Sequence, residues 1–426
     1  MQAVKMNIHP SHSQHSSNTS QSVFLPNELV TEVLSSLPVK SFMRMRCVSK
    51  FSNSLFTNPI FIRMHLLRSA RNPHLALVTS KTKNVVPLPV CHLLENPLIT
   101  LTDEPHYLMD DVCFNQSNSR VNHRVVGSCN GLICLLIFSI FDQDITFRFW
   151  NPSTRTISKA LGHLCFSSDR VNRRHHRVSQ YRSLKFVFGY DNLTSTYKVV
   201  SLNFQPRNRI TETKVFSLVD NVWRNIQNFP AAPLQFVYRF HPVYRFHHDY
   251  DGVYLSGTAN WLGVFEYKVK SLENYVIISL DLGTETYTQM HLPHGFVEMP
   301  RVDPTIGVLM NRLCFSYDFR LTHFVIWQMM DFGVQESWTQ FLQINYLDLQ
   351  ISSLDSIGYN FRDKELFMVP LYLSENDDRL ILGSSLEEQA ILYNMRDNSV
   401  ERTRITNKIR WFLVKEYVGS LVSTSE

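Results

Sequence analysis

The chain has 426 residues, 44% of them hydrophobic and 12% aromatic, which is enough to build one large core and a smaller second unit. Its formal charge of +5 is mild for this length and does not indicate a nucleic-acid partner. No apolar run approaches the roughly 20 residues of a membrane helix, and the first residues lack the apolar stretch of a secretory signal. We therefore expect a protein that neither enters a membrane nor is secreted.

The cysteines and the first residues point to a reducing compartment and to a disordered start. Seven cysteines, an odd number, are scattered without a CxxC pair, a usage typical of buried free thiols, so we expect the protein in the cytoplasm, the nucleus or both. Residues 1–22 are rich in Ser, His, Gln and Asn without periodicity, which predicts disorder. His9, His12 and His15 have no acidic or cysteine partner there, so no metal site is expected.

Between residues 23 and 70 the apolar residues recur at helical spacing. The first predicted helix carries Leu25, Leu29, Val33, Leu34 and Leu37, the second Phe42, Met45 and Val48, and the third Leu55 and Phe56. Pro38 separates the first two, Ser49 suits the cap of the third, and Asn58-Pro59 ends it. A further helix over 61–70 is expected to bridge to the rest of the chain.

This helical segment is too small to bury its own apolar side chains. A unit of roughly 40 residues usually needs a disulfide, a metal or a partner to stay folded. Cys47 is its single cysteine, so the segment can neither close a disulfide nor assemble a set of metal ligands. Its apolar surface must be covered either by another polypeptide or by the part of the chain that follows.

The same residues carry a family resemblance. The succession of LPNEL, EVLSSLPVKS, RMRCVSK and LFTNPIF resembles the F-box motif, which in that family docks on a Skp1-type adapter and so joins a cullin-based ubiquitin ligase. The resemblance implies that the residues that meet the adapter, or brace the helices, are Leu25, Pro26, Leu29, Val33, Leu34, Leu37, Pro38, Ser41, Met45, Val48, Lys50 and Leu55.

One position departs from the family pattern. A tryptophan commonly stands two residues after the lysine, and here that place is Ser52. The adjacent Phe51 is a partial replacement, so the departure implies a lower affinity for the adapter than is usual in the family.

From about Leu75 onward, short apolar strands alternate with polar turns. Hairpin turns are predicted at Asn130-Gly131, Ala259-Asn260, Met310-Asn311 and Arg362-Asp363, because Asn and Gly suit the positive φ of such turns. The last three lie roughly 50 residues apart, and a four-stranded unit repeated about every 40–50 residues is typical of a β-propeller. We expect a mainly β fold with a small α domain, in which a three-helix unit precedes a propeller of five or six blades over 75–422.

The two ends of the propeller region are expected to meet. The segments 75–88 and 411–422 both have the pattern of strands, and they either pair to close a ring of five blades or form a sixth blade. Ring closure would remove exposed end blades. Packing between blades is the expected role of the tryptophans, which are Trp150, Trp223, Trp261, Trp327 and Trp338, with Trp411 in the closing strand.

A second resemblance covers about residues 125–420. The pieces VVGSCNGLICL, FWNPSTR, FVFGYDNLTSTYKVV, VFSLVDNVWRNI, YLSGTANWL and ISLDLGTETYTQMHLP are similar to the F-box-associated domain of plant F-box proteins. That resemblance implies a kelch-like interaction module behind the F-box, although the chain contains neither the Gly-Gly pair of kelch repeats nor the Trp-Asp pair of WD40 repeats.

No residue set points to catalysis. There is no nucleophile elbow and no glycine-rich phosphate loop, so we expect no catalytic, cofactor or metal site. The HHDYDG run over 247–252 is expected in a solvated loop, since adjacent side chains diverge. The basic run over 170–177 is either an anion-binding or nuclear-import patch or an exposed insertion, and we favour the insertion.

Together the two resemblances imply a substrate-recognition subunit of an SCF-type (Skp1–cullin–F-box) E3 ubiquitin ligase. The F-box would hold the adapter and, through it, a cullin, while the propeller would hold an unidentified target protein. Ubiquitin transfer would rise through proximity alone. The alternatives are an adapter-binding module without ubiquitylation and a propeller hydrolase, which would need acidic or histidine side chains that converge at the central channel.

Overall fold

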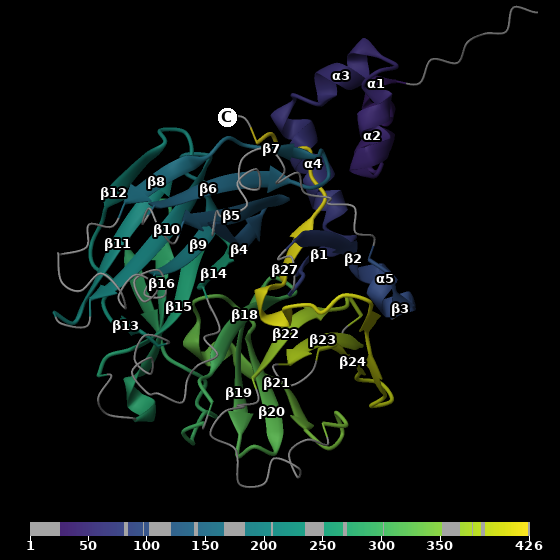
Figure 1. Ribbon diagram of the computed structural model, residues 1–426. Helices are drawn as coiled ribbons and strands as arrows, with labels where there is room; N and C mark the ends of the chain where they lie inside the picture. Colours follow the sequence, from purple (N-terminus) through teal and green to yellow (C-terminus); the bar gives the residue numbers. More distant parts are fainter. Residues whose placement is uncertain are drawn as a thin grey trace, which may run out of the picture.

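The structure is a computed structural model that describes residues 26–80, 84–96, 98–101, 121–139, 144–165, 184–205, 208–234, 251–266, 271–300, 302–351, 367–376, 378–384 and 388–424. A small group of helices lies at one side of a larger body of β-sheets (Figure 1). This order, a small α unit and then a β-propeller, is the predicted one. The predicted tail over 1–22 lies outside the described residues.

Four α-helices begin the described chain: α1 (Asn27–Ser35), α2 (Val39–Met45), α3 (Lys50–Leu55) and α4 (Pro59–Ser69). The predicted cap of α3 is confirmed, since Ser49 Oγ accepts a hydrogen bond from the Phe51 N–H at 3.2 Å. Asn58 caps α4, and Pro59 occupies its first turn, where a missing N–H costs little. The bridging helix expected over 61–70 therefore begins two residues earlier.

The helices enclose a small core of their own. Its buried residues are Leu34, Val39, Phe42, Leu55, Phe61 and, from far along the chain, Leu421. The buried His65 of α4 donates from Nε2 to the carbonyl of Leu37 at 2.9 Å, and Arg68 forms an ion pair with Glu32 of α1. These polar contacts hold α4 against the start of the helical unit.

Six sheets form the blades of a propeller. Blade one contains β4 (Val121–Cys129), β5 (Leu132–Ser139), β6 (Asp144–Asn151), β7 (Thr156–Ile157) and β8 (Leu161–Cys165). Blade two contains β9 (Leu184–Asp191), β10 (Thr196–Gln205), β11 (Ile210–Ser217) and β12 (Val222–Asn225). Blade three contains β13 (Ala232–Pro233), β14 (Val253–Leu255), β15 (Thr258–Val264), β16 (Tyr275–Asp281) and β17 (Tyr287–Met290). Blade four contains β18 (Thr305–Leu309), β19 (Arg312–Phe319), β20 (His323–Met329) and β21 (Trp338–Asn345). Blade five contains β22 (Met368–Leu373), β23 (Arg379–Ser384), β24 (Ile391–Asn394) and β25 (Val400–Arg402).

The sixth blade joins the two ends of the propeller. It consists of β2 (Val85–Pro89), β1 (Pro73–Val78) and β27 (Lys415–Val418), and β27 runs antiparallel to β1 with Pro73 opposite Val418. The innermost strands neighbour one another in the order β27, β4, β9, β14, β18, β22 and back to β27. The predicted pairing of the two end segments is thus confirmed, and it makes a sixth blade.

The remaining elements are short. They are α5 (Val90–Glu95), the parallel pair β3 (Leu98–Ile99) and β26 (Arg404–Ile405), and the 3-10 helices η1 (Leu272–Asn274), η2 (Gln335–Ser337) and η3 (Trp411–Leu413).

The hairpin turns confirm two predictions and correct a third. Asn130-Gly131 and Met310-Asn311 have positive φ, as predicted. The turn between β14 and β15 is Ser256-Gly257, with φ of 48° and 87°, so the prediction of Ala259-Asn260 is wrong. Those two residues lie buried inside β15, because the Asn260 amide bonds to neighbouring chain atoms within the blade. Arg362-Asp363 lies outside the described residues.

The tryptophans pack between blades, as expected. Each large apolar cluster of the propeller draws most of its residues from two neighbouring blades, and one of them also contains Phe204 of a third blade. These clusters contain Trp150, Trp223, Trp261, Trp327, Trp338 and Trp411. Trp411 lies in η3, just before β27 rather than in the closing strand, because its indole N–H donates to the carbonyl of Glu388 at 2.9 Å.

A buried ion network joins blades two and three. Lys198 Nζ lies 2.9 Å from Asp191 Oδ2 and 3.2 Å from Glu285 Oε1, which follows β16. Arg224 approaches the same Glu285 oxygen at 2.6 Å. Burial raises the pKa of Asp191, but hydrogen bonds from Thr194 and Lys198 outweigh burial and hold the pKa below its ordinary value. The FVFGYDNLTSTYKVV piece of the sequence therefore has a structural role in the ring.

Candidate functional site

The helical unit leaves apolar side chains uncovered. Leu29 and Val33 of α1 are 53% and 61% exposed, and Val48, between α2 and α3, is 75% exposed. Pro26, Pro38 and Lys50 are also exposed. Isolated exposed apolar residues are common on proteins, but several on one unit of four short helices indicate a surface that another protein covers.

The other residues of the predicted adapter set lie deeper. Leu34 and Leu55 are buried in the helical core, where they brace the helices. Leu37, Ser41 and Met45 are half-buried at its edge, and Leu25 lies outside the described residues. The structure thus divides the set into an exposed group and a bracing group, and adapter contact stays a prediction for each of them.

Two exposed apolar residues were not in the predicted set. Ile60 and Leu67 of α4 are 80% and 69% exposed, whereas Phe61 and His65 of the same helix are buried. Their seven-residue separation places them on one face, and that spacing is visible in PIFIRMHLLRS.

Ser52, at the place usually held by tryptophan, is buried in α3. Phe51 is half-buried and packs against the helical core. The Arg46 guanidinium lies over the Phe56 ring at 3.9 Å and donates to the Asn53 side chain at 3.2 Å. The small side chain at 52 is thus enclosed by the helical unit, and the nearby Phe51 and Phe56 pack against the helical core.

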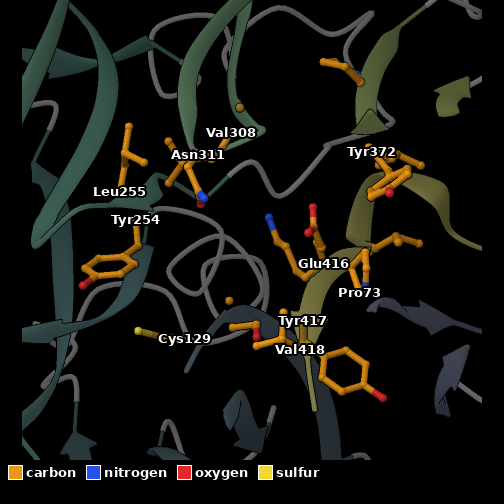
Figure 2. Close-up of a pocket in the computed structure, with 18 of the residues that line it drawn as sticks. Pro73, Cys129, Tyr254, Leu255, Val308, Asn311, Tyr372, Glu416, Tyr417 and Val418 are labelled. Atoms are coloured by element: carbon orange, nitrogen blue, oxygen red, sulfur yellow. The ribbon is translucent and has the colours of Figure 1, made fainter. Parts of the chain in front are cut away.

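A cavity of about 570 Å³ lies at the centre of the propeller. Its walls are formed by the innermost strands, and Figure 2 shows Tyr254 and Leu255 on one side with Glu416 and Tyr372 on the other. Its rim includes the hairpin turns after β4, β14 and β18 and also Ala70 and Arg71, which connect α4 to β1. The cavity therefore extends to the face of the ring that carries the helices.

One buried ion pair lies beside the cavity. Arg124 and Asp251 form a buried ion pair at 3.3 Å, and the Phe186 N–H donates to the same Asp251 oxygen at 2.9 Å. Burial raises the pKa of Asp251 against the opposing effects of Arg124 and Lys185. Burial likewise lowers the pKa of Lys415. Asp251 is thus a buried structural group, and the prediction of a solvated loop is wrong at this residue because the cations of neighbouring blades draw it inward.

Glu416 is one of the acids of the cavity wall. Water reaches its side chain through the cavity, but protein surrounds it on the other sides, and this burial raises the pKa of the carboxyl to about 7. No histidine is among the described residues of the wall. The wall therefore presents a carboxyl group whose pKa lies near neutral pH.

Two residue runs that were singled out in the sequence fall wholly or partly outside the part of the chain that the structure describes. The basic run over 170–177 and residues 247–250 lie outside the described chain. Across the ranges that the structure describes, no group of three His, Cys, Asp or Glu side chains is placed to hold a metal. In the same ranges no helix combines the length and the apolar character needed to cross a membrane.

Comparison with known proteins points to one family for both regions. Residues 24–64 match the family model of the F-box domain, and residues 96–311 match that of the F-box associated beta propeller domain. The chain is 28% identical to an F-box/kelch-repeat protein of Arabidopsis thaliana over 75% of this chain and 79% of the relative. It is 24% identical to the F-box protein CPR1 of Arabidopsis thaliana over 93% of this chain and 88% of the relative.

Solved structures resemble the chain only distantly. An α-L-arabinanase of Penicillium chrysogenum superposes with a TM-score of 0.37 at 10% identity, over 66% of this chain and 79% of that chain. The β-propeller domain of the Trilobed protease from Pyrococcus furiosus has a TM-score of 0.34 at 9% identity, over 66% and 69%. Neither likeness carries an argument about function.

Proposed function

We propose, from the premise that this chain belongs to the family of F-box proteins with an F-box associated β-propeller domain, that it is the substrate-recognition subunit of an SCF-type ubiquitin ligase. The F-box helices bind a Skp1-type adapter and, through it, a cullin. The propeller binds a target protein. The chain itself makes and breaks no bonds, and it works in the cytoplasm, the nucleus or both.

The exposed apolar side chains of the helical unit carry this proposal. The ring covers its own apolar faces, since every blade packs on two neighbours. The helical unit leaves Leu29, Val33 and Val48 in water, and each would gain roughly 1.5–3 kcal/mol from full burial. A protein that covers these residues gains that free energy on binding.

The proposed mechanism is proximity, because one rigid assembly holds both the target protein and the conjugating enzyme. A target on the propeller and a charged conjugating enzyme at the distant end of the cullin are kept at a bounded distance. The acceptor lysine then meets the enzyme at a high effective concentration, so transfer becomes faster without any catalytic group from this chain. The central cavity supports target binding on the face that carries the helices, because it is concave and combines apolar with polar walls.

The decisive experiment measures adapter binding by the intact chain and by a double variant, Leu29→Asp with Val33→Asp. Both side chains are exposed, so the fold should tolerate the change, while two carboxylates in an apolar contact should weaken binding by about 100-fold. The matched control is Val219→Asp, which changes an equally exposed valine on the turn between β11 and β12 and should bind normally. Equal binding by the double variant and the control would refute the assignment.

A second measurement separates the ligase from a module that only binds the adapter. The chain, the adapter, a cullin and a conjugating enzyme are combined with a cell extract, and ubiquitin on the proteins held by the propeller is quantified. The double variant should abolish the signal while the same proteins remain bound to the propeller. Ubiquitylation that is absent with the intact chain, although adapter and cullin are bound, would favour the non-ligase module.

A further inference from the structure

The segment after the last strand returns to the helices. Residues 419–424, called here the return segment, follow β27 directly and leave the ring on the face that carries the helical unit. Figure 1 shows this yellow end of the chain passing between β7 and α4. The helices are therefore joined to the ring twice, once through the covalent link from α4 to β1 and once through the return segment.

Asn151 of blade one binds the return segment through its side-chain amide. This residue is fully buried at the end of β6, and its Nδ2 donates to the carbonyls of Ser420 at 3.0 Å and Val422 at 2.8 Å. Its Oδ1 accepts from the Ser153 N–H at 3.0 Å. One side chain thus holds both its own turn and the backbone of a segment about 270 residues away.

The turn between β4 and β5 packs against the same segment. Gly131 has a φ of +81°, and a Cβ built there would lie 2.3 Å from Ser420 Cβ, so no larger residue fits without displacing the segment. On its other side, a Cβ at Gly419 would lie 3.3 Å from Ser153 Oγ and 3.7 Å from Val39 Cγ2 of α2. The return segment is therefore packed between blade one and the helices.

One side chain of the return segment lies inside the helical core. Leu421 is 1% exposed and belongs to the same cluster as Phe42 and Phe61. The next residue, Val422, packs instead against the core between blades one and two. Adjacent residues thus anchor in the two regions, and a shift of the ring relative to the helices would pull one of them out.

We propose that the return segment is the element that sets the orientation of the F-box on the propeller, with Asn151 and Leu421 as its positioning residues. A single covalent link leaves two domains free to rotate. The second connection removes this freedom, and it also completes the core of a helical unit that is too small to be stable alone. The orientation it sets is the one in which a target would be presented to the ligase.

The test measures the distance between the two regions in the full chain. Cys47 in the helices and Cys91 in α5 are exposed, whereas Cys129, Cys134 and Cys314 are buried, so spin labels are placed at the first two positions after Cys113 and Cys165 are changed to serine. Asn151→Ala and Leu421→Ala are compared with Asn394→Ala. Asn394 closes the equivalent turn after β24 of blade five, accepting from the Arg396 N–H at 3.0 Å, but it lies in another blade.

The intact chain and Asn394→Ala should each give a single narrow distance distribution. Asn151→Ala and Leu421→Ala should broaden it at least about twofold and raise amide exchange in α2 and α4 about tenfold, while β18 to β21 keep their protection. Leu421→Ile, which keeps the apolar contact, should restore the narrow distribution. Distributions as narrow in both positioning variants as in the intact chain would overturn the proposal. No adapter is needed, so this result is independent of whether the chain binds one.

Discussion

The propeller and the helical unit both contain apolar side chains that must be removed from water, and they cover these side chains in different ways. In the propeller each blade covers the next, and the pairing of β27 with β1 closes the ring, so no blade has an open face. In the helical unit a core of a few residues takes one leucine from the return segment, and side chains such as Val33 and Val48 stay in water.

The two regions therefore depend on their surroundings to different degrees. A closed ring of repeats gains stability from every interface between blades, so its stability is internal. A unit of four short helices gains little from its own core and relies on the ring behind it and, by our proposal, on an adapter in front of it. A region that must bind a partner through apolar contacts keeps those contacts unsatisfied until the partner arrives.

The largest expected effect comes from emptying the helical core. Phe42 is fully buried, and its ring lies 5.0 Å from that of Phe61. Phe42→Ala should cost about 3–5 kcal/mol, which is enough to unfold the helices while the ring stays folded. Hydrogen exchange should lose protection in α1 to α4 alone. Phe332→Ala, at a residue 36% exposed, is the control and should change little. Equal loss of protection in the blades would contradict an internally stable ring.

The converse change weakens the ring and spares the helices. Lys198→Met leaves the buried Asp191 without its cation, whereas Glu285 keeps Arg224, and breaking such a buried pair costs about 3–5 kcal/mol. Urea unfolding followed by tryptophan fluorescence should report this loss. Lys408→Met removes only an exposed pair with Glu388 and should cost less than about 1 kcal/mol. Similar costs for the two variants would show that the buried network does not brace blades two and three.

A smaller expected effect is the acid sensitivity of the helical unit. Burial lowers the pKa of His65, so the folded helices hold the neutral imidazole. Their stability is then fully present above pH 6.5, the unfolded pKa, and falls as the pH drops through the lower folded pKa. The protection factors of the α4 amides, which are corrected for the intrinsic exchange rate, should fall between pH 7 and pH 5, and His65→Gln should reduce this pH dependence. An unchanged dependence in that variant would assign the effect to other groups.

The smallest expected effect is in the ring, where a rise in pH, rather than a fall, should lower the stability. Burial raises the pKa of Glu416 from 4.5 to about 7. The contribution of this group is therefore fully present below pH 4.5 and is lost as the pH rises to about 7. Glu416→Gln should be as stable as the intact chain at pH 5 and more stable at pH 8, by about 1 kcal/mol, since water in the cavity screens the charge. Thermal unfolding at the two pH values measures the difference, and equal stability at pH 8 would contradict it.

Local features were readable from the sequence because neighbours along the chain decide them. The Ser49 cap, the break at Pro38 and the Asn130-Gly131 turn each depend on a few adjacent residues, and each lies where it was predicted. Ala259-Asn260 was misassigned because asparagine favours turns only when its amide has no better partner. Inside β15 the amide nitrogen of Asn260 donates to Val253 of the neighbouring strand and to Thr258, a pairing that the order of residues in the turn does not indicate.

Alone, the sequence determined the helical unit, the repeated hairpins and the family resemblance, since all of these follow from periodicity and short-range patterns, whereas it left the role of the two end segments open. Only the tertiary structure decided which apolar residues of the helices are exposed, that Asp251 is drawn to Arg124, and that Leu421 enters the helical core. The reason is physical: such burial depends on side chains that lie hundreds of residues apart and meet only when the ring closes.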